Sequence, residues 1–473
     1  MTDRRKEQAS GISPRELALY VMLEVSEKGG YSHIILRDVM EKYQYLEKRD
    51  RAFLSRLCEG TLEQQLRMDE VLNRFSSVPV KKMKPVIRNI LRLGVYQLLF
   101  MDSVPDSAVC NESVKLAVKK GFAPLKGFVN GVLRSIARNK EEALLPFGKE
   151  HPDVPDAEFM SIKYSMPAWL VERWLSVYKR EQTEQMLKAF LEGRNTQIRC
   201  NLSRITPEQL KKRLEAEGVR AEILPCLPYA LEISGYDYLE KLSAFREGLF
   251  QVQDISSMLC AAAADPKAGD FCLDVCAAPG GKSLHLADLL AVREAEAVQN
   301  EASGGFVEAR DLTEYKIRLL EENIQRSKRS NIRARQWDAT VFDPEMEGAA
   351  DIVLADLPCS GLGVIGRKKD IKYKITPEAL EELAALQRSI LAVVSRYVKV
   401  GGTLMYSTCT VNRGENEDNV RWFLETFPFE PVSLEAVLPS GLGPETARQG
   451  YVQLLPGMHA CDGFFFAKFR RMQ

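Results

Sequence analysis

Residues 271–282 have the sequence FCLDVCAAPGGK, an apolar run that ends in a proline and two glycines before a lysine. The run at 271–275 is typical of a buried strand, and a helical pattern follows it. Gly280 and Gly281 allow the backbone to turn sharply and to approach a ligand closely. In open α/β sheets, ligands bind where the first strand runs into its helix. This stretch therefore predicts a cofactor-binding turn at the start of an α/β domain.

Strands and helices alternate after this turn. Further strands are predicted at 305–310, 333–337, 351–354, 402–406 and 463–469, and helices at 282–290, 314–327, 377–398 and 415–425. The alternation predicts a doubly wound parallel sheet with an antiparallel strand near the end. Residues 292–303 are acidic and rich in small side chains, and we expect a surface insertion there.

The chain before this domain divides into two different patterns. Apolar residues recur at three- and four-residue spacing from Ser13 to about Lys140, which predicts an all-α bundle of about six helices over residues 1–142. Residues 143–156 are expected to form a linker. Short strands at 197–201 and 230–233, with a helix capped at Thr206, predict a small α+β domain over 157–265, followed by the α/β domain at 266–473.

Bulk composition indicates a soluble protein of several domains. The 473 residues are 45% hydrophobic and 27% charged, which is ordinary for a globular protein. The polar N-terminus and the absence of an apolar run of about 18 residues predict no secretory signal and no membrane span. Ten cysteines without a C-x-x-C pair and only four histidines predict neither a disulfide framework nor a metal site. We expect a cytoplasmic, monomeric protein.

The net charge of zero conceals a basic region. Residues 71–140 contain 13 Lys and Arg against 3 Asp and Glu, so the remainder carries the opposite excess. Such asymmetry indicates nucleic acid binding, although a solvated helix face or a protein-docking bundle would have the same composition. If the region neutralises about six phosphates of single-stranded RNA, the log–log salt slope of affinity is expected near −4. The basic residues that we expect to contribute are Lys81, Lys82, Lys84, Arg88, Arg92, Lys115, Lys119, Lys120 and Lys126.

Two cysteines follow predicted strands in the α/β domain. Cys359 lies in the segment DLPCSG just after Asp356, and Cys409 lies in YSTCT. Parallel strands bring their carboxyl ends to one edge, so both sulfurs and the carboxylate are expected in one pocket. A thiolate is a strong nucleophile, and a nearby carboxyl group can donate a hydrogen bond or a proton to an electron-poor ring. The residues alone do not decide which sulfur attacks.

Acidic residues also end two other predicted strands. Asp311 follows the strand at 305–310, where a carboxylate suits the two hydroxyl groups of a ribose, and Glu308 is its competitor. Asp338 follows the strand at 333–337, where it would meet the amino group of a base. Helix capping is the alternative role for both. Together with the glycine turn, these acids favour a ligand that contains adenosine.

These segments resemble a known family. Residues 274–282, 356–365 and 406–417 resemble the signature segments of RNA cytosine-C5 methyltransferases that use S-adenosylmethionine, and residues 251–257 and 367–373 resemble their flanking motifs. Residues 91–98 and 127–134 resemble the NusB-like RNA-binding domain. The resemblance covers nearly the whole chain and is to the bacterial Sun (RsmB) type. It implies a NusB-like bundle, a small α+β segment and a Rossmann-like class I methyltransferase domain that acts on 16S ribosomal RNA.

The resemblance also implies roles for individual residues. Cys409 would add to cytosine C6 as the nucleophile, Cys359 would assist the later elimination, and Asp356 would border both cofactor and base. Lys282 would help to position the target. Asp311 would bind the ribose and Asp338 the adenine side. The methionine end of the cofactor would be surrounded by Cys276, Ala277, Ala278, Pro279, Gly280, Gly281 and Lys282.

Three rival functions fit parts of the sequence. The same chemistry on transfer RNA needs the same residues, and the NusB-like module favours the ribosomal substrate. A non-catalytic RNA-binding or antitermination factor would not need Cys359, Cys409 and Asp356 to be intact. A methyltransferase that acts on amino or carboxyl groups would need no paired cysteines.

Overall fold

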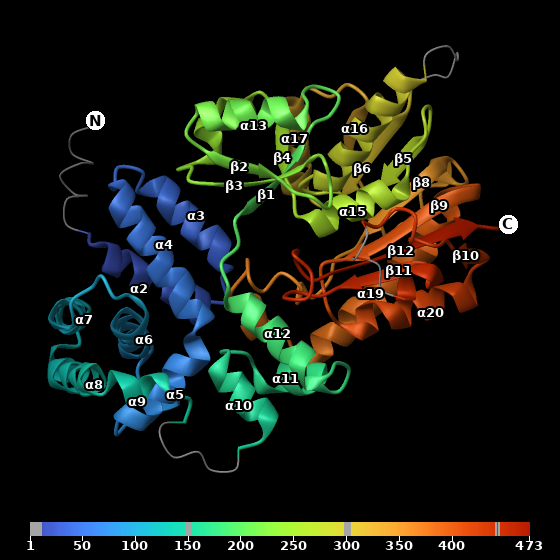
Figure 1. Cartoon of the computed structure of the whole chain (residues 1–473). Coiled ribbons are helices and arrows are strands. Elements are labelled where there is room, and N and C mark those ends of the chain that lie inside the picture. Colours follow the sequence, from blue (N-terminus) through green and yellow to red (C-terminus); the bar gives the residue numbers. More distant parts are fainter. Residues whose placement is uncertain (1–11, 148–153, 298–303, 440–441, 443–444) are drawn as a thin grey trace. The chain divides into compact units, whose positions relative to one another are not determined.

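The computed structural model describes residues 12–147, 154–297, 304–439, 442 and 445–473. These residues form two compact units (Figure 1). Unit 1 comprises Met1–Leu191 together with Ile365–Lys374, and unit 2 comprises Glu192–Val364 and Ile375–Gln473. The predicted boundaries at 142, 156 and 265 remain predictions, and the α+β segment expected at 157–265 contributes residues to both units.

Unit 1 is helical, as predicted, and begins with a capped helix. The side chain of Ser13 accepts a hydrogen bond from the backbone of Glu16, and Pro14 occupies the first helical position, where its missing N–H costs nothing. Between residues 14 and 138 the described chain forms seven α-helices, one more than expected. These seven are α2 (Pro14–Ser26), α3 (Ser32–Lys42), α4 (Lys48–Glu63), α5 (Gln65–Phe75), α6 (Pro85–Phe100), α7 (Asp106–Lys119) and α8 (Lys126–Arg138), and they are followed by α9 (Lys140–Leu144), α10 (Asp156–Lys163), α11 (Ala168–Leu175) and α12 (Arg180–Leu191).

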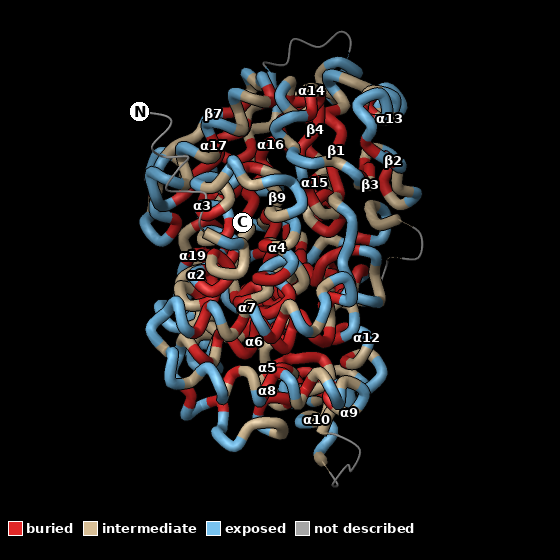
Figure 2. Tube along the Cα trace, turned by 90° about the vertical axis from the view of Figure 1, so that its left-hand side faces the viewer, coloured by how far each residue is buried: buried red, intermediate tan, exposed pale blue. Residues whose placement is uncertain are grey.

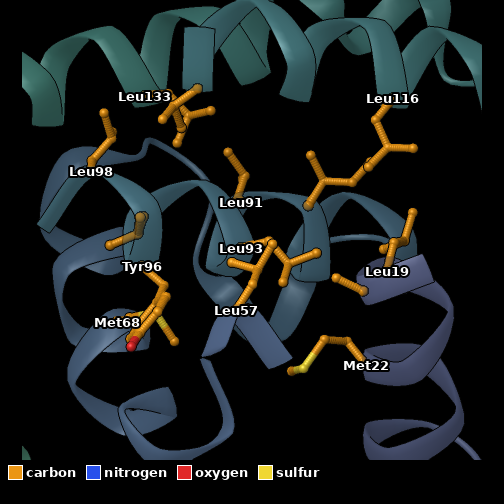
Figure 3. Packing of buried hydrophobic residues seen from close by; sticks show 14 of the residues in the cluster. Leu19, Met22, Leu57, Met68, Leu91, Leu93, Tyr96, Leu98, Leu116 and Leu133 are labelled. Atoms are coloured by element: carbon orange, nitrogen blue, oxygen red, sulfur yellow. The ribbon is translucent and has the colours of Figure 1, made fainter. Parts of the chain in front are cut away.

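Helix α6 lies at the centre of the bundle. Twelve of its sixteen residues are buried, and Figure 2 shows buried residues concentrated along α5 and α6. Leu91, Leu93 and Tyr96 of α6 pack with residues of α2, α4, α5, α7 and α8 (Figure 3). This packing explains the apolar spacing of residues 87–99, which serves the core and leaves little of the helix for ligands. Part of the predicted linker is also helical, because α9 ends at Leu144.

A small antiparallel sheet opens unit 2. The strand order is β2-β3-β1-β4, and the predicted strands at 197–201 and 230–233 correspond to β1 and β3. The helix predicted after Thr206 is present with a complete capping box, in which Thr206 and Gln209 satisfy each other's backbone N–H groups. The elements are β1 (Thr196–Cys200), α13 (Pro207–Ala216), β2 (Arg220–Ile223), β3 (Ala230–Ser234), α14 (Ser243–Arg246) and β4 (Phe250–Val252).

The large sheet has the predicted doubly wound topology. Its order is β10-β12-β9-β8-β5-β6-β7, with β11 paired to β12. Strands β5 to β9 are parallel to one another, and β12 is antiparallel to β9, β10 and β11. The strands are β5 (Phe271–Asp274), β6 (Phe306–Asp311), β7 (Ile332–Gln336), β8 (Ala350–Asp356), β9 (Val398–Thr408), β10 (Phe429–Pro431), β11 (Tyr451–Leu454) and β12 (Phe464–Arg471).

Helices cover both faces of this sheet (Figure 1). Residues of α15, α16 and α17 share one buried cluster with the strands, and residues of α19 and α20 share the other. Two expectations are corrected. Helix α16 continues through Val292 to Glu296, so the first part of the expected insertion is helical, and residues 298–303 lie outside the described residues. The helix expected at 377–398 ends at Val394. The helices are α15 (Ile255–Ala264), α16 (Gly281–Glu296), α17 (Glu314–Ser327), α18 (Ile371–Lys374, in unit 1), α19 (Pro377–Val394) and α20 (Glu417–Thr426).

The described residues contain no membrane span, metal cluster or disulfide. None of their helices combines the length and the apolar character that a membrane span requires. No group of three or more His, Cys, Asp or Glu side chains in them is arranged to hold a metal ion. All ten cysteines lie in described parts of the chain, and no disulfide links them.

Candidate active site

The sheet changes direction between β5 and β8. From β5 the chain proceeds outward through β6 and β7, then returns to β8 and β9 on the other side of β5. The carboxyl ends of β5 and β8 therefore diverge into loops at a topological switch point, where ligands bind in open α/β sheets. The glycine turn follows β5, Asp356 ends β8, and Cys409 follows β9 directly. Topology thus brings the predicted site residues to one edge.

The glycine turn after β5 is held by backbone hydrogen bonds. Gly280 has a φ of +102°, which favours glycine, and its N–H donates to the carbonyl oxygen of Ala277 over 2.7 Å. The N–H of Ala277 donates to the carbonyl oxygen of Arg310 at 2.8 Å, and the N–H of Ala278 donates to Asp311 Oδ2 at 3.0 Å. The Ala278–Pro279 peptide bond is cis. These hydrogen bonds fix the turn to the end of β6.

Asp311 and its competitor Glu308 occupy different environments. Asp311 is the last residue of β6, and its Oδ1 atom lies 2.9 Å from the half-exposed Lys316 ammonium group. Glu308 lies inside the strand, is fully buried and forms ion pairs with Arg310 and Arg333. Glu308 is therefore committed to the core of the sheet, whereas Asp311 stands at the ligand edge. This placement favours Asp311 over Glu308 as the ribose-binding candidate.

Asp338 is exposed and follows β7. Its Oδ1 atom accepts hydrogen bonds from the N–H of Thr340 at 2.9 Å and from the Thr340 hydroxyl at 2.7 Å. These hydrogen bonds lower the pKa of Asp338. Asp338 therefore closes a turn and caps no helix, so the helix-capping alternative is wrong for this residue, and contact with a nucleoside base remains a proposal.

Asp274, which the sequence did not single out as a site residue, ends β5 in full burial. Its Oδ2 atom accepts a hydrogen bond of 2.6 Å from Ser283 Oγ in the first turn of α16. Burial raises the pKa of Asp274 to about 7, the carboxylate of Asp356 adds to that rise, and Ser283 and Lys282 oppose it. This carboxyl group links the strand to the helix that carries Lys282.

Lys282 and Asp356 form an ion pair across the switch point. Lys282 Nζ lies 2.7 Å from Asp356 Oδ2, and the hydroxyl of Ser407 donates to Asp356 Oδ1 at 2.7 Å. Burial alone would lower the pKa of Lys282, but Asp356, with the Cys260 and Cys409 thiols, outweighs burial and raises it. Lys282 therefore stays an ammonium ion and holds the carboxylate of Asp356 in place.

The two candidate cysteines lie in contact. Cys359 Sγ and Cys409 Sγ are 3.3 Å apart, and both residues are half-buried. The hydrogen bond to Cys409, followed by burial, raises the pKa of Cys359 well above that of an ordinary thiol. Either sulfur can be the donor of this hydrogen bond. Burial raises the pKa of Cys276 as well. The contacts found among the described residues do not join Cys276 to this pair.

Glu415 positions both cysteine loops, and sequence reasoning gave it no role. Its buried carboxylate accepts hydrogen bonds from Ser360, which follows Cys359, and from Asn412 in the loop after Cys409. Gln387 of α19 donates to the same carboxylate and also to the carbonyl oxygen of Pro358. The acid lies within the segment 406–417 that carries the family resemblance, but only the fold reveals its partners.

The basic region of unit 1 is partly neutralised. Arg92 forms a two-point ion pair with Asp69, Arg88 pairs with Glu27, and Lys119 and Lys120 both pair with Glu16. Lys115 is paired with Glu112. Four exposed lysines have no carboxylate within ion-pair distance among the described residues, and they are Lys81, Lys82, Lys84 and Lys126.

Three family models match consecutive parts of the chain. Residues 261–470 match the family described as 16S rRNA methyltransferase RsmB/F, and residues 12–138 match the NusB family. Residues 166–236 match the RsmF/B-like ferredoxin-like domain. The matches follow the helical bundle, the small sheet and the large sheet in that order.

Curated relatives match over nearly their full lengths. A protein of Bacillus subtilis (strain 168), described as a probable ribosomal RNA small subunit methyltransferase B, is 35% identical over 467 residues, or 97% of this chain and 99% of that protein. The ribosomal RNA small subunit methyltransferase B of Cronobacter sakazakii is 32% identical and covers 97% of this chain and 98% of its own.

Solved structures are similar as well. The crystal structure of PH0851 matches with a TM-score of 0.77 and 26% identity, covering 98% of this chain and 99% of its own. The structure of NSun6 from Pyrococcus horikoshii with SFG has a TM-score of 0.55 and 24% identity over 65% of this chain and 98% of its own, a likeness of fold.

Proposed function

The chain belongs to the RsmB/F family of 16S rRNA methyltransferases, and from this premise we propose that it methylates C5 of a cytosine in 16S ribosomal RNA. S-adenosylmethionine is the cofactor of this family. The proposal includes a covalent adduct between Cys409 and C6 of the base. The observation that carries it is the contact between Cys359 and Cys409 at 3.3 Å, on loops that follow neighbouring strands β8 and β9.

The residues at the switch point fit the cofactor. S-adenosylmethionine, when bound, supplies an electrophilic methyl group on a positively charged sulfur. The carboxylates of Asp311 and Asp356 end β6 and β8 on either side of the glycine turn after β5, and negative charge there favours a cation. Asp311 is buried, and the ammonium group of the half-exposed Lys316 would have to move away from its carboxylate for a ribose to bind there.

Cys409 is assigned as the nucleophile. Its thiolate forms a bond to C6 of cytosine, and the electron pair of the C5–C6 double bond moves to C5, which becomes able to accept the methyl group. The assignment follows the resemblance of residues 406–417 to the signature segment of the family, and the contact at 3.3 Å places Cys359 beside the nucleophile. After methylation, the C5 proton leaves to a base, the C5–C6 double bond forms again, and the Cys409 sulfur departs.

The Lys282–Asp356 pair would bind the ring during the addition. Negative charge develops on the base as the sulfur adds, and a hydrogen bond or proton supplied to the ring stabilises it. The ammonium group of Lys282, 2.7 Å from the carboxylate of Asp356, would be the donor of this hydrogen bond or proton. Ser407 fixes the other carboxylate oxygen. A cytosine within a duplex cannot reach these groups, so the substrate is single-stranded or flipped RNA.

The proposal is tested with purified protein, unmodified 16S ribosomal RNA and an isotopically labelled methyl donor. Nucleoside mass spectrometry is expected to find labelled 5-methylcytidine, and bisulfite sequencing is expected to place it at one or a few positions. Unmodified transfer RNA serves as the competing substrate. Label in another nucleoside would contradict C5 methylation, and a higher kcat/KM on transfer RNA would contradict the ribosomal substrate.

A further inference from the structure

A short basic segment between the two cysteines belongs to unit 1. Ile365–Lys374 has the sequence IGRKKDIKYK, with five basic residues and one acid, while the chain on both sides of it belongs to unit 2. The segment begins six positions after Cys359 in the sequence. A segment that only joined two elements would not need five basic residues, so the contacts of these side chains are of interest.

Buried polar contacts fix the segment on the helical bundle. The carboxylate of Asp370 accepts hydrogen bonds from the N–H and the hydroxyl of Ser32, at 3.1 and 2.5 Å. The fully buried Lys372 donates to the carbonyl oxygens of Glu63 and Ser165, at 2.8 and 2.5 Å. These hydrogen bonds of Asp370 and Lys372 hold the segment on the bundle, whereas Lys368 and Lys374 are not part of them.

Two aromatic rings lie beside those cations. Tyr31 is 54% exposed, and the ammonium group of Lys374 lies 4.0 Å from the centre of its ring. The exposed His33 ring is 6.1 Å from the Tyr31 ring. Lys368 is exposed and has no carboxylate within ion-pair distance among the described residues. We name this surface the Tyr31 patch, and it consists of Tyr31, His33, Arg37, Lys368 and Lys374.

Charges of both signs act on the His33 ring. Partial burial lowers the pKa of His33, and the charges of Lys368, Arg37 and Lys374 lower it further, whereas Asp370 opposes them. Asp370 is buried and already paired with Lys374. Asp38 and Glu41 lie near Arg37 at 3.5 and 3.8 Å, in exposed pairs that water screens. Lys368 is therefore the one cation of the patch without a carboxylate partner among the described residues, and it acts on the same ring, His33, as the other two.

We propose that the Tyr31 patch binds single-stranded RNA, with a base stacked on Tyr31 and the adjoining phosphates near Lys368 and Arg37. Cations interleaved with exposed aromatic rings are the combination that single-stranded nucleic acid requires. The proposal rests on the proposed function, because RNA is the substrate there. Lys368 is nine residues from Cys359, a chain length of about 30 Å at most, so RNA held on the patch remains tethered near the cysteine loop.

The test measures binding of the full-length protein to a fluorescently labelled single-stranded fragment of 16S ribosomal RNA. Tyr31→Ala is expected to weaken binding about tenfold, because base–aromatic stacking is lost, and Tyr31→Phe is expected to bind like the wild type. Lys368→Glu is expected to weaken binding and to reduce the log–log salt slope by about 0.7 or more. Tyr45→Ala and Lys179→Glu, equally exposed positions of unit 1, are the matched controls.

The outcomes separate this proposal from the proposed function. Steady-state kinetics on Tyr31→Ala are expected to show a raised KM for RNA with kcat unchanged, and Cys409→Ala is expected to bind RNA normally without forming product. If the wild type makes no 5-methylcytidine but Tyr31→Ala still weakens RNA binding, only the proposed function fails. If Tyr31→Ala and Lys368→Glu bind RNA as tightly as their controls, the patch is not an RNA site, and a protein-docking surface takes its place.

Discussion

Both carboxylate oxygens of Glu415 bind Ser360, the residue that follows Cys359. Glu415 Oε2 accepts the Ser360 N–H at 2.9 Å, and Oε1 accepts the Ser360 hydroxyl at 2.5 Å. Asn412 and Gln387 donate to the same carboxylate. One buried acid therefore connects the loops after β8 and β9 with helix α19, and the contact between the two cysteine sulfurs depends on it.

Glu415→Gln is expected to lower both stability and methylation. The amide offers a single acceptor oxygen and places an NH₂ group against donors, so at least one buried donor loses its partner, at about 1–3 kcal/mol. The urea midpoint is expected to fall, and kcat is expected to fall more than RNA affinity. The exposed Glu425→Gln is the control, expected within about 0.5 kcal/mol of wild type. Unchanged kcat in Glu415→Gln would remove its positioning role.

Replacing each cysteine is expected to separate their roles. Cys359→Ala should form the adduct but release it slowly, so a protein–RNA complex should accumulate on a denaturing gel. Cys409→Ala should give neither product nor adduct. Cys226→Ala, another half-buried cysteine, is the control and should behave like the wild type. An adduct that accumulates in Cys409→Ala instead would exchange the two assignments.

The Lys282–Asp356 pair is expected to show coupling in a double-mutant cycle. Asp356→Asn leaves the buried ammonium group without its charge partner. Removing one member of a fully buried pair costs about 3–5 kcal/mol, and we expect about 1–3 kcal/mol here because the Asp356 side chain is 30% exposed. Lys282→Met with Asp356→Asn should lose less stability than the sum of the two single changes, measured by urea unfolding. Strict additivity would mean that the pair contributes nothing.

The stability of unit 2 is expected to fall between about pH 4 and pH 7 because of Asp274. Its folded pKa of about 7 lies above its unfolded value of about 3.9, so the folded state holds a proton that the unfolded state has lost. Stability relative to Asp274→Asn should therefore fall by about 1.4 kcal/mol per pH unit as pH rises through this window, and level off above pH 7. Urea unfolding at pH 5, 6, 7 and 8 measures the difference. Asp338→Asn, at an exposed acid whose pKa is lowered, should show no such trend.

Replacing Lys81, Lys82 and Lys84 with Gln is expected to reduce the salt dependence of RNA affinity. Each lost phosphate contact removes about 0.7 from the log–log slope, so the three changes should remove about 2. Lys119→Gln and Lys120→Gln should change the slope less, since both lysines are paired with Glu16. Equal effects from both sets would indicate that the ion pairs open on RNA binding.

The fold was largely predictable because its signals are local. The strand, glycine turn and helix around Gly280 follow from backbone freedom and hydrophobic spacing, and the helix predicted at 314–327 coincides with α17. The extension of α16 to Glu296 was missed because a sequence rich in acidic and small residues is typical of the protein surface, whether it forms a helix or a loop. Strands β10 and β11 were missed because they are short and pair only with the distant β12.

The proximity of the proposed site residues could be predicted from the sequence, but the residues that position them could not. Cys359, Cys409 and Asp356 follow strands, so parallel topology alone brings them together. Glu415 and Asp274 escaped notice, since a buried acid is recognisable only when its partners are known. Likewise, several cations of the basic region are neutralised by acids far away in sequence, as Arg92 is by Asp69. The amino-acid composition gives the number of such charges, but it does not show which of them form ion pairs.

The loop that carries Cys359 crosses the chain just before its last strand. The N–H of Gly463 donates to the carbonyl oxygen of Gly363 at 2.9 Å, the Gly363 N–H donates to the carbonyl oxygen of Cys409 at 3.0 Å, and a side chain on either glycine would collide with the other backbone. The crossing joins positions one hundred residues apart. This crossing can form only after residue 463 has been synthesised, so the loop after Cys359 gains its contact with the C-terminal part of the chain late in synthesis.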